Sequence, residues 1–68
     1  NVAKIQLNGA PYEIRSGINL IELLKSLKIS NNKVAIEVNG ESVEKKKYQY
    51  LTLNKNDKVE IVHFIGGG

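Results

Sequence analysis

The fold is decided within residues 3–27, AKIQLNGAPYEIRSGINLIELLKSL, where the spacing between apolar residues changes. In the first half, apolar and polar side chains alternate on both sides of Asn8-Gly9, as they do in half-buried strands. Asn and Gly both tolerate the positive φ that a tight hairpin turn needs. In the second half, four leucines follow the helical spacing i, i+3, i+4 and i+7: Leu20, Leu23, Leu24 and Leu27. This stretch therefore predicts a β-hairpin followed by one helix.

The start of the helix is marked by its polar residues. Asn19 can cap the first free N–H groups, and Glu22, three residues later, can reach back to complete a capping box. Ile18 and Leu23 stand at the positions of a hydrophobic staple. The polar run 30–32 is expected to end the helix.

Downstream of the helix, the pattern predicts two clear strands and a weaker one. Residues 34–38 are rich in branched side chains and are followed by Asn39-Gly40, a second turn signal. Residues 58–64 alternate and form the last strand. Between them, residues 44–50 are expected to be irregular with at most one helical turn, and Leu51 and Leu53 to form a short edge strand.

The order of these elements predicts an α+β fold of the β-grasp, ubiquitin-like type. A helix that leaves a hairpin and returns the chain to the same sheet must cross over in the right-handed sense. We expect a mixed four- to five-stranded sheet with one main helix packed on one face. Residues 1–65 are expected to form this domain, and residues 66–68 a flexible, glycine-rich C-terminal tail.

Composition excludes several classes of protein. The 68 residues allow one small domain, and the absence of cysteine excludes disulfides, thiolate metal sites and a cysteine nucleophile. No apolar run approaches the ~20 residues of a membrane-spanning helix, and no signal peptide is visible. We therefore expect a protein of the cytoplasm, or of an organelle interior derived from it. The net charge of +3 is below that expected of a nucleic-acid-binding protein.

Side chains that could carry catalysis are scarce. His63 is the only histidine, and a catalytic or metal-bound histidine needs convergent partner groups that the sequence does not supply. We interpret it as a partly buried strand residue and expect no metal site. The run 45–47 is basic and lies beside Tyr48 and Tyr50. It is read as a solvated face or a docking surface for an acidic protein, in preference to a nucleic-acid site.

Val62 and Phe64 are apolar on the strand face opposite Val59 and Ile61. If the helix covers one face of the sheet, these two side chains lie on the open face. Scattered apolar residues are normal on surfaces, so they either have no role or form a partner-binding patch near the tail. As the only phenylalanine, placed just before the glycines, Phe64 favours the patch.

The last three residues of the sequence, Gly66, Gly67 and Gly68, are its most informative feature. Glycines there add no packing, so they represent a cloning remnant, a frayed end or a functional arm. Residues without side chains can pass through a narrow channel and deliver a terminal carboxylate to a partner's active site. There the carboxylate can be activated as an acyl-adenylate.

Over nearly its whole length the chain resembles the ThiS family of sulfur-carrier proteins. The resemblance rests on Val38-Asn39-Gly40-Glu41, on Asp57, and on Val59–Ile65 running into the glycines. Two departures are visible, because the family's frequent Asp-Gly-Asp turn reads Lys55-Asn56-Asp57 here and a common proline is replaced by Glu44. Neither departure touches the tail.

The resemblance implies a carrier that is not itself an enzyme. In the family an E1-like adenylyltransferase activates the terminal carboxylate, here that of Gly68, which becomes a thiocarboxylate and donates sulfur to thiazole synthase. Gly66 and Gly67 would thread the tail into the partner. Sulfur would come from a cysteine desulfurase system, and ATP and Mg²⁺ would be bound by the activating partner, so this chain binds no cofactor. The carrier is expected to be a monomer between its transient complexes. Its partner contacts would be Val62, His63, Phe64 and Ile65.

Four alternatives stay open from the sequence. The small subunit of molybdopterin synthase shares the fold and the Gly-Gly chemistry, and a ubiquitin-like modifier shares the activation step. A nucleic-acid-binding β-domain is disfavoured by the modest charge. A structural module with glycines added by cloning is disfavoured by the resemblance upstream of the tail.

Overall fold

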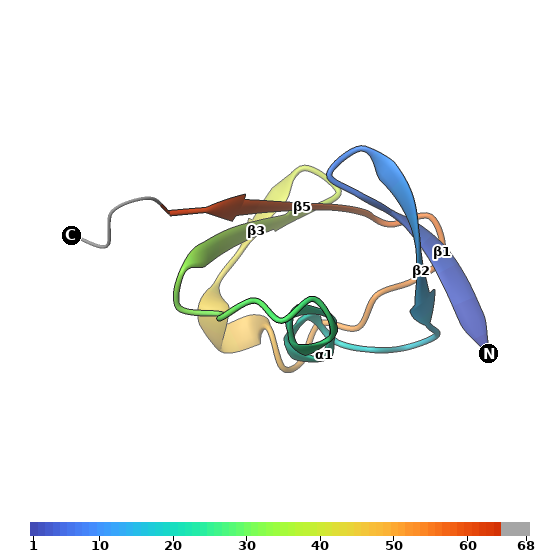
Figure 1. Ribbon diagram of the computed structural model, residues 1–68, viewed down its shortest axis with the longest axis horizontal. Helices are drawn as coiled ribbons and strands as arrows, with labels where there is room; N and C mark the ends of the chain where they lie inside the picture. The colour runs from blue at the N-terminus through green and yellow to red at the C-terminus, as the bar shows by residue number, and fades with distance from the viewer. Residues whose placement is uncertain (65–68) are drawn as a thin grey trace.

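The computed structural model describes residues 1–64, which form five strands, one α-helix and one short 3₁₀ helix (Figure 1). In chain order the elements are β1 Val2–Leu7, β2 Ala10–Arg15, α1 Leu20–Ser26, β3 Val34–Val38, β4 Glu41–Val43, η1 Lys45–Lys47 and β5 Lys58–His63. Neither helix in this range is long and apolar enough to cross a membrane.

The five strands form one mixed sheet in the order β2-β1-β5-β3-β4. β5 is the central strand: it runs parallel to β1 and antiparallel to β3. The two hairpins, β1–β2 and β3–β4, occupy opposite sides of it. Helix α1 lies across one face of the sheet, and the other face is left open (Figure 1). The β-grasp prediction is thereby confirmed, with five strands.

Helix α1 is bounded by specific caps at both ends. The Asn19 side chain accepts the Glu22 N–H at 2.8 Å and the Glu22 carboxylate accepts the Asn19 N–H at 2.9 Å, which confirms the predicted capping box. At the other end, Lys28 adopts a positive φ of 60°, and the N–H groups of Lys28 and Ile29 donate to the Lys25 and Leu24 carbonyls. This Schellman motif ends the helix before the predicted polar run is reached.

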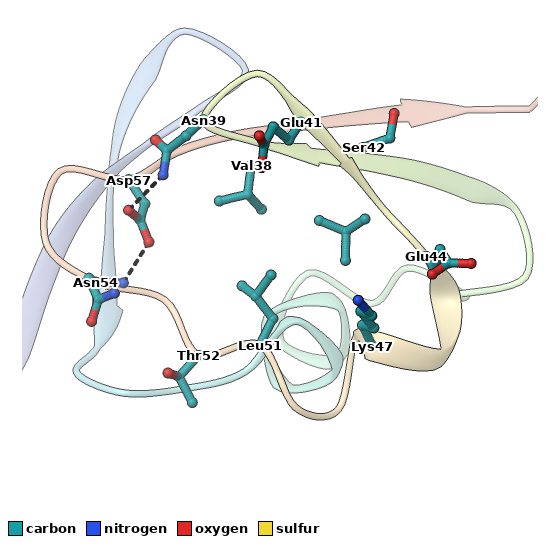
Figure 2. Close-up of a pocket in the computed structure, with 11 residues that line it drawn as sticks. Val38, Asn39, Glu41, Ser42, Glu44, Lys47, Leu51, Thr52, Asn54 and Asp57 are labelled. Atoms are coloured by element: carbon teal, nitrogen blue, oxygen red, sulfur yellow. Dashed lines mark hydrogen bonds between the residues drawn. The ribbon is translucent and has the colours of Figure 1, made fainter.

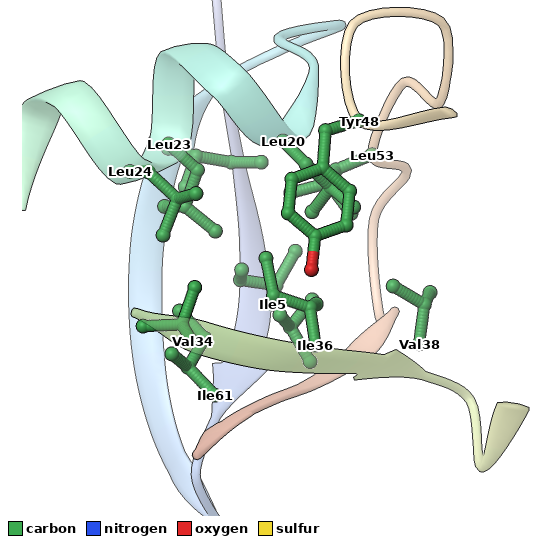
Figure 3. Close-up of a cluster of buried hydrophobic side chains, with 12 residues drawn as sticks. Ile5, Leu20, Leu23, Leu24, Val34, Ile36, Val38, Tyr48, Leu53 and Ile61 are labelled. Atoms are coloured by element: carbon green, nitrogen blue, oxygen red, sulfur yellow. The ribbon is translucent and has the colours of Figure 1, made fainter. Parts of the chain in front are cut away.

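The hydrophobic core lies between α1 and the sheet (Figure 3). Leucines of the helix face branched residues of β1, β2, β3 and β5, and two residues of the connection from η1 to β5 close its side. The fully or nearly fully buried side chains are Ile5, Ile14, Leu20, Leu23, Leu24, Val34, Ile36, Val38, Tyr48, Leu53, Val59 and Ile61. Along β3 and β5 every second residue is buried, as the alternation in the sequence predicts, whereas β4 contributes no fully buried side chain.

The predicted edge strand at Leu51 and Leu53 is wrong. Leu53 is buried in the core and its N–H donates to the Ile18 carbonyl at 2.8 Å, while Thr52 makes only an isolated bridge with Asn19. The edge of the sheet is β4 instead, a three-residue strand too short to show alternation. It pairs with β3 because the Asn39-Gly40 turn folds the chain straight back.

Candidate functional site at the end of β5

The end of β5 leads toward the glycines and is hydrogen-bonded mainly on the side of β3. Pairing with β3 continues to Phe64, whose N–H donates to the Lys33 carbonyl at 2.9 Å. Pairing with β1 stops earlier, at Val59 opposite Leu7. Figure 1 shows β5 extending past the β1–β2 hairpin toward the C-terminus, with β3 beside it.

On the β1 side, the Asn8 side chain adds hydrogen bonds to β5 beyond the point where strand pairing stops. Its Oδ1 accepts the Ile61 N–H at 2.8 Å, and its Nδ2 donates to the Ile61 carbonyl at 3.4 Å. The Asn8 main-chain N–H donates to the Val59 carbonyl at 2.9 Å. Asn8 has φ 51°, the left-handed conformation of the hairpin turn, so one residue both turns the chain and binds β5 through an amide that replaces a peptide group.

Asn39 binds the beginning of β5 in the same way. It also has a positive φ, 53°, and its Oδ1 accepts the Lys58 N–H at 2.9 Å. Its Nδ2 donates to the Asp57 carboxylate at 3.1 Å, and the other oxygen of Asp57 accepts the Asn54 N–H at 2.8 Å. Two residues that carry the family resemblance, Asn39 and Asp57, therefore fix where the last strand starts.

A cavity of about 410 Å³ opens beneath these contacts, between the β3–β4 hairpin and the chain leading into β5 (Figure 2). Its lining includes the carboxylates of Glu41, Glu44 and Asp57. Within residues 1–64 no three His, Cys, Asp or Glu side chains are grouped so as to hold a metal ion. Because both oxygens of Asp57 accept hydrogen bonds, we assign that carboxylate a structural role.

Val62 and Phe64 lie where the sequence predicts, on the open face of the sheet. Their side chains are 58% and 60% exposed, whereas Val59 and Ile61 are buried on the helix side. Val62 stands beside Ala35 of β3, which is also exposed, so apolar atoms gather at this end of the face. Of the predicted partner contacts, Val62 and Phe64 are therefore both exposed at this end of the open face of the sheet.

His63 is exposed, and the prediction that it is partly buried is wrong. Its position in the alternation directs it to the helix side, where its partner on β3, Val34, is buried. The pairing of β5 with β1 has ended by then, at Val59, so His63 has no neighbouring strand on that side. It does not share the face of Val62. The remaining predicted site residues, Ile65, Gly66, Gly67 and Gly68, lie outside the described residues.

Sequence reasoning missed the hydrogen bonds from Asn8 and Asn39 to β5. Both residues were predicted only as turn formers. Asn-Gly is a strong local signal for a hairpin, but the acceptors and donors that the two amides meet are 53 and 19 residues away along the chain. Only the assembled sheet brings them into reach.

Three comparisons relate the chain to known proteins. The ThiS family model matches residues 5–68. The sulfur carrier protein ThiS of Bacillus subtilis is 38% identical over 65 residues, which cover 94% of this chain and 98% of that protein. The crystal structure of a thiamine biosynthesis protein (ThiS) from Geobacter metallireducens superposes with a TM-score of 0.82 at 34% identity, covering 96% of this chain and 99% of that one.

Two longer relatives carry a different name. The thiazole synthases of Magnetococcus marinus and Paramagnetospirillum magneticum are 43% and 40% identical to this chain over 65 residues. The match covers 96% of this chain in both cases. The chain spans only a fifth of the length of each, 20%.

Proposed function

Since the chain belongs to the ThiS family, we propose that it is a sulfur-carrier protein of thiamine biosynthesis whose Gly68 carboxylate becomes a thiocarboxylate. The observation that carries this function is the family match itself, which runs from β1 through β5 and includes all three terminal glycines. Asn8 and Asn39 support it, since they fix the strand that leads into those glycines. Residues 66–68 would serve as the arm that presents the reacting carboxylate.

The proposed reaction takes place on the carboxylate and not in a pocket of this chain. A Gly68 carboxylate oxygen attacks the α-phosphorus of ATP and displaces pyrophosphate, which leaves an acyl-adenylate. A persulfide sulfur from a cysteine desulfurase system then attacks the acyl carbon, and AMP leaves. A thiol reduces the resulting acyl disulfide and releases the thiocarboxylate. An E1-like adenylyltransferase binds the ATP and Mg²⁺, so this chain acts as a co-substrate.

Thiazole synthase is the proposed acceptor of the sulfur. Two proteins of that name contain a segment similar to this chain, so in them carrier-like and synthase-like sequences share one polypeptide. A segment joined to its partner encounters it at a high effective concentration, which suits a repeated transfer. The match to the ThiS family favours this acceptor over molybdopterin synthase.

Intact mass spectrometry tests the function directly. We expect incubation with ATP, Mg²⁺, a sulfur source and the E1-like enzyme of the same organism to raise the mass by the difference between sulfur and oxygen. Deletion of Gly68 should abolish the gain, because the remaining carboxylate is one residue too short to reach the ATP. The mass of the protein isolated from its source must also correspond to a chain with a free carboxylate on Gly68.

The control is the Bacillus subtilis relative, loaded in the same tube. If the relative gains sulfur and this chain does not, the proposed function is wrong. If both gain it, separate incubations with thiazole synthase and molybdopterin synthase identify the acceptor, and transfer to the latter alone would contradict the thiazole assignment.

A further inference from the structure

A basic hollow lies on the helix side of the molecule, away from Val62 and Phe64. It has a volume of about 490 Å³ and is bordered by α1, the loop after it and η1. Lys25 projects from the helix, Lys45 and Lys46 from η1, and all three are exposed. We call this surface the α1–η1 hollow.

The charge of the α1–η1 hollow is strongly unbalanced. Its lining contains three lysines and one acid, Glu22, whose carboxylate already accepts the Asn19 N–H in the capping box. The rest of the polar lining is neutral and consists of Asn and Gln amides, which can donate hydrogen bonds as well as accept them. Lys45 is held toward the loop by a hydrogen bond of its Nζ to Asn32 Oδ1 at 3.3 Å. The hollow therefore favours an anionic occupant.

A smaller, more apolar hollow adjoins it. Its volume is about 230 Å³, and Ile21, Leu24 and Ile29 contribute to its lining. The two hollows share Ile21, Lys25 and Asn31, so they form one continuous surface. Anionic and apolar groups can be bound side by side there.

The residues that line the two hollows favour a protein partner over a nucleic acid. Binding to single-stranded nucleic acid relies on exposed aromatic side chains for base stacking, and neither hollow is lined by an aromatic residue. The nearby Tyr48 is buried in the core. Branched apolar side chains next to lysines instead match a peptide in which acidic and aliphatic residues occur together.

We propose that the α1–η1 hollow and its apolar neighbour bind an acidic, aliphatic-containing segment of a partner protein. The surface lies on the opposite side of the sheet from Val62, as the position of α1 in Figure 1 shows. A partner bound there leaves the end of β5 uncovered. The molecule can therefore bind one protein through its helix side while a second protein acts on its tail.

A labelled peptide of alternating Glu and Leu serves as the probe, with binding followed by fluorescence anisotropy. We expect binding that weakens as salt is added, because the attraction is screened. Lys25→Gln/Lys45→Gln/Lys46→Gln should weaken it by about 10-fold. The matched control, Lys4→Gln/Lys55→Gln/Lys58→Gln, removes the same charge from exposed lysines elsewhere and should change it by less than about 2-fold.

A second variant and a second peptide complete the test. Lys25→Gln/Lys46→Gln keeps the hydrogen bond of Lys45 to Asn32 and is used if the triple variant has a lowered Tm. The same peptide with Gln in place of Glu should not bind. Equal losses in the hollow and control variants, absence of peptide binding, or tighter binding of single-stranded DNA or anionic vesicles than of the peptide would each overturn the proposal. Because the assay does not involve Gly68, failure of sulfur loading leaves this result unaffected.

Discussion

Tyr48 shows how a single residue joins an irregular segment to the core. It follows η1, is only 2% exposed, and points its ring into the space between α1 and β3 (Figure 3). Burial raises the pKa of Tyr48 above its ordinary value, since the phenolate is poorly solvated there, and the nearby Ile36 backbone offsets part of that effect.

The raised pKa of Tyr48 predicts a loss of stability in alkali. A phenol whose pKa is higher in the folded state stabilises the protein below the unfolded pKa of 10.0, and this contribution disappears as the pH rises through the folded value. We expect Tm to fall above pH 10.0 and Tyr48→Phe to reduce that fall.

The control is Tyr50→Phe, which removes a phenol that is 75% exposed. Its Tm should decline in alkali as the unsubstituted protein does. An equal alkaline decline in Tyr48→Phe would show that the buried phenol does not govern it.

At the scale of elements, the two Asn-Gly turns do more than join strands. Each hairpin lies beside β5, and each turn presents an amide to it, Asn8 at Ile61 and Asn39 at Lys58. The Asn8 amide supplies hydrogen bonds on the β1 side of β5, where strand pairing has stopped, and the Asn39 amide supplies one on the β3 side, at the start of β5. The turns thereby help to hold the strand from which the tail departs.

We expect Asn8→Gly to lower the free energy of unfolding by about 1 kcal/mol, because the N–H and the carbonyl of Ile61 both lose their hydrogen bond to the Asn8 side chain. Glycine keeps the positive φ of the turn accessible, so backbone strain does not contribute. Denaturant unfolding measures the change, and faster exchange of the Ile61 amide proton localises it.

Asn56→Gly is the matched control for this turn. Asn56 also has a positive φ, 73°, but its side chain takes no part in binding β5. Its replacement should leave stability unchanged or slightly improved. If Asn8→Gly behaved like Asn56→Gly, the side-chain contact to Ile61 would be of no energetic importance.

At the scale of the whole molecule, the sheet separates two surfaces of different character. The open face ends in the apolar side chains of Val62 and Phe64, and the helix side carries the α1–η1 hollow. A single layer of strands with one helix leaves both available at once. The apolar end lies next to the proposed tail chemistry, so we propose that it contacts the activating enzyme.

We expect Phe64→Ala to raise the KM of the activating enzyme for the carrier by about 10-fold with little change in kcat, as for loss of an aromatic contact made equally in the ground and transition states. The rate of sulfur loading at varied carrier concentration measures both constants. Tyr50→Ala, which removes another exposed aromatic residue, should change neither. Equal effects of the two substitutions would contradict a specific docking role for Phe64.

The sequence alone determined four of the five strands, the helix and their order. The apolar pattern specified β1, β2, β3 and β5, leucine spacing specified the helix, and Asn19 with Glu22 marked its start, because each of these signals acts between residues at most a few positions apart. The exposed face of Val62 and Phe64 followed from the same alternation. The glycine tail and its resemblance to the ThiS family were equally visible in the sequence.

Only the tertiary structure decided which segment became the sheet edge, how far His63 was exposed, and what Asn8 and Asn39 bind. Leu51 and Leu53 had a strand-like pattern, but Leu53 was more stable in the core beneath α1, and the edge position went to β4. His63 was exposed because the pairing of β1 with β5 ended at Val59, before β5 did. These outcomes depend on contacts between residues distant in sequence, whose free energies exist only after the chain has folded and are therefore absent from any local pattern.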